Sequence, residues 1–300
     1  MARKWEGKSR GGSFGYLFFI RLLRTFGLGA AYAFLGLVVL YFIPFAPSQT
    51  ASSWKYARRI LGMSRFRSAA FLVRSYYSFG KSLIDKIATG SGMMDEFSFE
   101  FENHDLILGP VKAGCGCIAI GAHVGSWQMG TPFFGQYGSR INVVMYDSEH
   151  EKVKKVLENH VQTDRFKIIP VNGEGMDHVF AISEALGKGE TVCFQGDRYM
   201  DGSRHLTAGF MGHDAKFPLG PFLLASKMKV PVVFYFAMRE KGRKYRFMFF
   251  SPEMFPCSGT EKNGAERILA SYAAALESVV KKYPEQWFNY YDFWDLRKND

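Results

Sequence analysis

The sequence predicts an α/β fold, in which a mostly parallel sheet is flanked by helices and follows an N-terminal membrane-associated helix. From residue 97 onward, short apolar runs of strand character alternate with helical stretches. This alternation is typical of parallel strands joined by right-handed crossovers. Before these runs, residues 25–54 contain no charged side chain. The 300 residues, 47% of them hydrophobic, suffice for one large domain with an appendage or for two small domains.

Positive charge is concentrated near the N-terminus. Residues 1–84 carry thirteen Lys or Arg and one acid, Glu6, whereas the remaining residues are slightly acidic in sum. Because this charge flanks the most apolar segment, it favours an anionic membrane surface as the partner. Nucleic acid is not expected, since no recognition motif accompanies the charge. We expect a basic, apolar anchoring segment over 1–50 and a domain over 51–300.

The apolar segment runs from Phe26 to Ile43 and ends at Pro44 and Pro47. Its eighteen residues are marginal for a membrane span, which needs about 17–25. Both flanks are basic, so the positive-inside rule gives no clear orientation. Three modes stay open: a tilted span, a helix lying in one leaflet with both flanks cytosolic, or a buried helix of a soluble domain. Pro-Phe-Ala-Pro is a poor cleavage site, which argues against a secretory signal peptide.

The domain begins with a helical lead-in over 51–95, in which residues 54–87 have a period near 3.6 and Gly62 offers a break. The α/β core is expected over 97–300. Its predicted strands are 97–101, 106–108, 116–120, 141–146, 167–171, 191–195, 230–237 and 245–250, and its predicted helices are 125–137, 150–162, 177–186, 219–228 and 265–282.

The four cysteines do not form a disulfide framework in a chain of this length, and a reducing compartment fits them. Cys115-Gly-Cys117 resembles half of a zinc site, but the other half is missing. We therefore interpret the pair as small residues of a buried strand. Neither a metal nor a resident cofactor is expected.

Polar side chains follow two of the predicted strands directly. His123 and Gln128 lie after 116–120, and Asp197 and Arg198 lie after 191–195. In open α/β sheets, ligands bind at the carboxyl ends of strands. These two clusters are therefore the candidate site.

The segment Ala-His123-Val-Gly-Ser-Trp-Gln128 resembles the histidine-x4-acid block of the lysophospholipid acyltransferase superfamily, and of its bacterial lipid A late acyltransferases in particular. Further matches occur in the expected order along residues 12–294: Gln195-Gly-Asp-Arg198, Gly209-Phe-Met-Gly212 with Phe217-Pro-Leu-Gly-Pro221 and Val230-Pro-Val-Val233, and Pro284-Glu-Gln-Trp-Phe-Asn289. Each match is weak alone, whereas the ordered set is specific.

The resemblance implies an acyltransferase-like fold and transfer of a fatty acyl group from an acyl-carrier protein or coenzyme A thioester. The implied acceptor is a hydroxyl or amine of a membrane lipid, such as a lipid A precursor or an aminoacyl lipid. It also implies a location on the cytoplasmic face of the bacterial inner membrane. Two rivals stay open: a non-catalytic lipid-binding relative, and a thioesterase or lipid hydrolase.

His123 is the expected general base, since its reference pKa of about 6.5 suits proton transfer near neutral pH. The family has an acid where this chain has Gln128, and three explanations compete. Another acid, Asp197, Asp147 or Glu149, acts in its place; Gln128 is native and tunes the enzyme; or Gln128 is an introduced replacement of Glu.

Arg198 is the candidate for binding an acceptor phosphate or carboxylate, or for stabilising an oxyanion. Asp197 would then orient Arg198 or assist His123. The alternative is a buried Asp197–Arg198 pair that only holds the loop.

Overall fold

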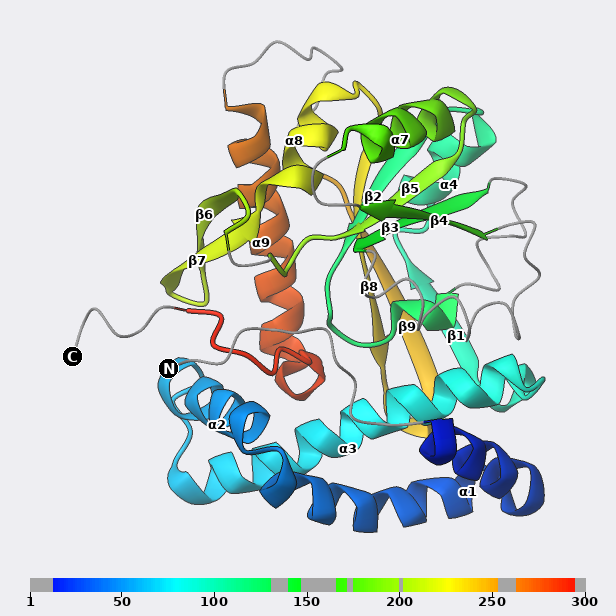
Figure 1. Cartoon of the computed structure of the whole chain (residues 1–300), viewed down its shortest axis with the longest axis vertical. Coiled ribbons are helices and arrows are strands. Elements are labelled where there is room, and N and C mark those ends of the chain that lie inside the picture. Colours follow the sequence, from blue (N-terminus) through cyan, green and yellow to red (C-terminus); the bar gives the residue numbers. More distant parts are fainter. Residues whose placement is uncertain are drawn as a thin grey trace.

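Seven strands form one sheet in the computed structural model, which describes residues 13–130, 140–146, 166–171, 175–199, 202–252 and 263–294 (Figure 1). Every pairing in the sheet is parallel except that of β8 with β9. The predicted fold class is therefore confirmed. In spatial order the strands are β1 (Ser98–Glu102), β9 (Lys244–Phe250), β8 (Val232–Arg239), β2 (Cys117–Gly121), β5 (Thr191–Gln195), β3 (Ile141–Tyr146) and β4 (Phe166–Val171).

Helices cover both faces of the sheet, as an interior parallel sheet requires. Along β8, Phe234 and Phe236 belong to one buried cluster, while Tyr235 and Ala237 belong to a second cluster on the other face. The first cluster contains residues of α7 (Asp177–Gly187), α8 (Leu219–Lys227) and α9 (Gly264–Lys282). The second contains residues of α1 (Ser13–Phe45), α4 (Asp105–Lys112) and the C-terminal half of α3 (Arg65–Gly90).

The predicted lead-in helix is divided. It comprises α2 (Pro47–Lys55), a wide turn over Tyr56–Ile60, and α3. The break falls at Gly62, whose φ is 63°, and Ser64 then caps α3 by accepting a hydrogen bond from the Arg67 N–H at 3.4 Å. The break expected at Gly62 is therefore confirmed, whereas a continuous helix is not.

Two predictions for the core were wrong. Residues 106–108 are not extended but lie inside α4, because three apolar residues fit either period and Asp105 begins a helical turn. Cys115, interpreted as part of a buried strand, is exposed and precedes β2. The core also contains a hairpin that no predicted strand covers, formed by β6 (His205–Phe210) and β7 (His213–Pro218). Its two-residue turn, Met211-Gly212, has positive φ at both positions, as hairpin turns of this length favour.

Two predicted helices cannot be compared in full. The helix expected over 150–162 lies outside the described residues. Of the helix expected over 125–137, the described part begins with Gly125 in an isolated bridge to Ala237 and continues as the short 3-10 turn Trp127–Gly130.

Candidate active site

His123 lies in a tight loop that follows β2, defined here as the His123 loop (residues 122–126). Gly125 has a φ of 62°, and a Cβ at this position would lie 2.0 Å from the Ala237 carbonyl oxygen. Only glycine therefore permits the close approach by which the Ser126 N–H donates to that same oxygen at 2.8 Å. The loop is fixed against β8, with His123 at the carboxyl end of β2.

The second loop follows β5, which pairs with β2 so that Gly121 lies opposite Gln195. The Gly196 N–H donates to the Gly121 carbonyl at 2.9 Å and extends this pairing by one residue. A Cβ on Gly196 would lie 2.7 Å from Ile120, so glycine is needed for this approach as well. The next residue, Asp197, is thereby placed beside His123.

His123 and Asp197 form a hydrogen-bonded dyad. The imidazole Nδ1 lies 2.7 Å from Asp197 Oδ1, and the His123 backbone N–H donates to Oδ2 at 2.9 Å. The carboxylate is fully buried, whereas the imidazole is 26% exposed. With Nδ1–H directed at the carboxylate, Nε2 is the nitrogen that can accept a proton from a substrate.

The surroundings keep Asp197 ionised. Burial raises the pKa of this carboxyl, but the charge and hydrogen bonds of His123 and the charge of Arg198 lower it by more, so the net shift is downward. A charged carboxylate is the form that both orients an imidazole and stabilises an imidazolium.

The dyad bears on why this chain has Gln128 where the family has an acid. This residue lies in the short turn Trp127–Gly130. The Nδ1 position of His123 is occupied by Asp197, the acid that follows a neighbouring strand. The geometry therefore favours the first of the three explanations, in which another acid replaces the one missing at Gln128. Asp147 and Glu149 lie outside the described residues.

Arg198 contacts the C-terminal segment. Its Nη2 donates to the Phe288 carbonyl at 2.8 Å, and its guanidinium lies 5.9 Å from the centre of the Tyr291 ring. The Tyr291 hydroxyl donates in turn to the Asp197 carbonyl at 3.1 Å. These contacts join the loop after β5 to the C-terminal segment.

The segment 284–289 supports the His123 loop, a role that its sequence did not reveal. The Gly125 N–H donates to the Gln286 carbonyl at 2.8 Å, and the Phe288 N–H donates to the His123 carbonyl at 3.0 Å. The Gln286 side chain binds both backbone groups of Arg239, at 2.9 Å to its N–H and 2.7 Å to its carbonyl. The only signal for this role was the position of the segment in the ordered set of motifs.

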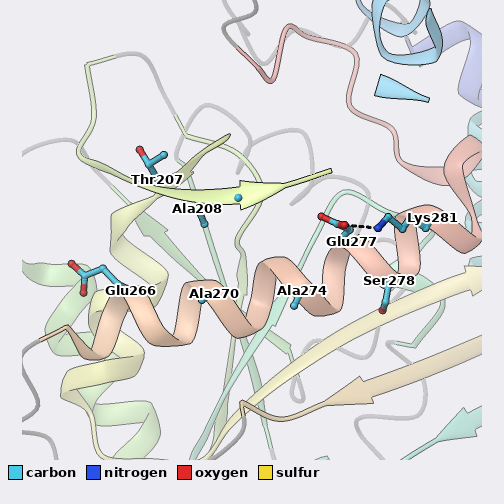
Figure 2. A pocket seen from close by; sticks show the side chains of 9 residues that line it. Thr207, Ala208, Glu266, Ala270, Ala274, Glu277, Ser278 and Lys281 are labelled. Atoms are coloured by element: carbon cyan, nitrogen blue, oxygen red, sulfur yellow. Dashed lines mark ion pairs between the residues drawn. The ribbon is translucent and has the colours of Figure 1, made fainter. Parts of the chain in front are cut away.

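A groove of about 540 Å³ lies elsewhere, between the β6–β7 hairpin and α9 (Figure 2). Its described lining includes Ala270, Ala274 and Glu277, and neither member of the dyad. Glu277 is paired with Lys281 and also accepts from the Met211 N–H. The groove is therefore separate from the dyad. Within the described ranges, no group of three His, Cys, Asp or Glu side chains could hold a metal ion.

Comparison with known families matches residues 11–294 to one family, described as bacterial lipid A biosynthesis acyltransferase. The matched range contains both site loops, the hairpin and the C-terminal segment. A search of curated proteins finds no match.

Proposed function

Since the chain belongs to the bacterial lipid A biosynthesis acyltransferase family and is therefore an acyltransferase of lipid biosynthesis, we propose that His123 is the general base of its reaction and that Asp197 orients it. The observation that carries this proposal is the 2.7 Å contact between His123 Nδ1 and the buried Asp197 carboxylate. The contact leaves Nε2 as the ring nitrogen that accepts the proton.

The reaction needs a base because the donor is already activated and the acceptor is not. As the acceptor oxygen attacks the thioester carbonyl carbon, Nε2 takes its proton, and a tetrahedral intermediate forms with His123 as the imidazolium. Collapse of the intermediate breaks the C–S bond, and the imidazolium gives the proton to the departing thiolate sulfur. Asp197 stays ionised throughout and stabilises the imidazolium.

Gln128 and Arg198 have supporting roles in this proposal. Gln128 stands in the family's acid position without being the acid, and shapes the turn after the His123 loop. Arg198 holds the Phe288 carbonyl and adds positive charge beside Asp197. That charge lowers the pKa of the carboxyl on which the dyad depends.

The substrates follow from the family and from the N-terminal segment. The donor is an acyl thioester, of acyl-carrier protein or coenzyme A, and the acceptor is a hydroxyl or amine of a membrane lipid such as a lipid A precursor or an aminoacyl lipid. The enzyme works at the cytoplasmic face of the inner membrane. In support, one helix within the described ranges, Phe18–Phe45, is long and apolar enough to cross a membrane, by length and composition alone.

The test is acyl transfer by the purified protein. It is incubated in detergent with acyl-CoA or acyl-carrier protein and bacterial lipid extract, and both released thiol and acylated lipid are measured. We expect both products, and we expect His123→Ala to abolish them while His213→Ala, a change at an exposed histidine of the hairpin, does not. Thiol release without acylated lipid would identify a thioesterase, and full activity of His123→Ala would refute the proposed base.

A further inference from the structure

The N-terminal helix α1 has two distinct faces. After the kink at Gly27, one face is buried and includes Leu28, Ala31, Leu35 and Val39, which belong to the same hydrophobic cluster as residues of α3. The spacing of these residues, at three and four positions, is that of one helical stripe. In α3, a Cβ on Gly80 would lie 2.3 Å from Leu35, so this glycine permits the close approach of the two helices. Most of the length of α1 therefore lies along α3 (Figure 1).

A buried polar cluster joins α1 to the catalytic domain. We call it the Asp85 cluster, and it comprises Asp85 of α3, Tyr32 of α1, Arg239 of β8 and Tyr245 of β9. The Tyr32 hydroxyl donates to Asp85 Oδ1 at 2.5 Å. Arg239 Nε and the Tyr245 hydroxyl donate to Oδ2 at 2.7 and 2.6 Å. Moving α1 away from the domain would break the first bond and open the buried carboxylate to its surroundings, which costs free energy.

These contacts are incompatible with α1 crossing a membrane in this conformation. A helix that spans while packed along α3 would carry α3 into the hydrocarbon as well. α3 holds Arg65, Arg67, Arg74, Lys81, Asp85 and Lys86, and each such charge is costly at the centre of a bilayer. The kink at Gly27, with a φ of 75°, also leaves only eighteen residues in the second part of α1, about 27 Å in length.

The outward face of α1 is apolar and exposed. Phe26, Phe34, Leu37, Leu40, Tyr41 and Phe45 are all exposed. At the start of α3, Phe66 is 90% exposed and lies between Arg65 and Arg67. In Figure 1 the N-terminal end of α3 lies beside α1 along the lower edge of the molecule, on the side opposite α7.

We propose that this surface lies in the plane of one anionic leaflet, so that α1 and the N-terminal end of α3 enter the interface together and the chain does not cross the bilayer. The occupant is a lipid surface because aromatic and aliphatic side chains are flanked by exposed arginines: Arg21 and Arg24 before the apolar stretch, Arg58 after it, and Arg65 and Arg67 around Phe66. This composition is that of an interfacial helix. The choice of a lipid bilayer as the partner rests on the proposed function. The inference that the chain does not cross the bilayer does not rest on it.

The first test determines topology in the full-length chain, with an epitope tag on a protease-sensitive linker at each terminus. In inverted membrane vesicles, whose cytosolic face is outward, we expect protease to remove both tags. Loss of one tag only from inverted vesicles and the other only from spheroplasts would show a span and overturn the proposal. The assay does not use acyl transfer, so His123→Ala should give the same digestion pattern. Failure of the proposed function is thereby distinguished from failure of the proposed topology.

The second test measures partition of the purified protein onto vesicles of phosphatidylethanolamine with phosphatidylglycerol. Phe66→Ser should weaken binding about tenfold, because an exposed phenyl ring no longer enters the leaflet. The matched control is Phe180→Ser, which removes a ring that is 72% exposed on α7, on the opposite side of the molecule. Unchanged binding of Phe66→Ser, equal loss with Phe180→Ser, or concentration-dependent self-association in place of vesicle binding would each refute a lipid-facing surface.

Discussion

A neutral amide in the family's acid position does not by itself remove the acid from this site. The imidazole of His123 needs one anionic partner, and Asp197 supplies it from a different strand. Full burial makes the carboxylate effective, because no water competes for the Nδ1–H bond. The proposed catalytic pair is thus specified by two strand ends rather than by one local motif.

Replacing Asp197 by Asn should reduce kcat by about 10³- to 10⁴-fold. The amide can donate to Nδ1, which favours the wrong imidazole tautomer and removes the charge that stabilises the imidazolium. Steady-state thiol release measures the effect, with circular dichroism as the check on folding. Asp214→Asn, which changes an exposed carboxylate on the hairpin, should leave kcat within about twofold. Comparable losses in the two variants would mean that the Asp197 contact has no catalytic role.

Gln128→Glu should change kcat by less than about tenfold, because the Nδ1 position of His123 is already filled. The same thiol-release assay measures it. A gain of a hundredfold or more would show instead that the acid of this site belongs at position 128. That result would support the interpretation of Gln128 as an introduced replacement of Glu.

The same dyad makes folding stability depend on pH. The pKa of Asp197 is lowered in the folded protein, so its ionised form favours the folded state at every pH above the unfolded value, about 3.9. This contribution is lost as the pH falls through the folded-state pKa. Between pH 7 and pH 3, the free energy of unfolding measured in urea should therefore fall by more for the wild type than for Asp197→Asn. Parallel pH dependence in the two proteins would contradict this.

At the scale of elements, Gly125 and Gly196 place the two site loops, and Gly125 can be tested against Gly212 of the hairpin turn. Gly125→Ala should destabilise the protein more than Gly212→Ala, and should also lower kcat. Both positions have positive φ, at 62° and 81°, but only the Cβ at 125 would strike a backbone oxygen, whereas that at 212 would meet open space. Gly212→Ala should cost only the conformational term of about 1–2 kcal/mol. Thermal melts and kcat measure the pair, and equal melting temperatures would show that the clash is relieved elsewhere.

The elements also show what the sequence alone could establish. Apolar periods located each strand of the seven-stranded sheet within two residues, because buried strands are rich in apolar residues, but they missed the two strands of the hairpin. They did not give the order of the strands. Asp197 was one of three candidate acids, since its place beside His123, seventy-four residues away, depends on β5 pairing with β2. Gln286 escaped notice because its side chain acts on the backbone of Arg239, and a bond to backbone leaves no pattern of paired residue types.

At the scale of the whole molecule, one path of hydrogen bonds runs from α1 to the loop of the proposed base. Tyr32 binds Asp85, Asp85 binds Arg239, and the Arg239 backbone is held by Gln286, whose carbonyl accepts from the His123 loop. The Asp85 cluster therefore joins α1, the proposed lipid-facing element, to the loop that carries the proposed base. We expect the stability of the Asp85 cluster to determine whether α1 remains packed on the domain.

Removing the cation of the cluster should destabilise the protein strongly. Arg239→Met leaves the Asp85 carboxylate buried without its positive partner, which typically costs about 3–5 kcal/mol. Arg74→Met is the matched control, because it breaks an exposed pair with Glu285 and should cost less than about 1 kcal/mol. Urea unfolding in detergent micelles gives both values, and protease digestion reports whether α1 is released first. If Arg239→Met costs no more than Arg74→Met, the cluster does not hold α1, and the packing of Leu35 against Gly80 must do so instead.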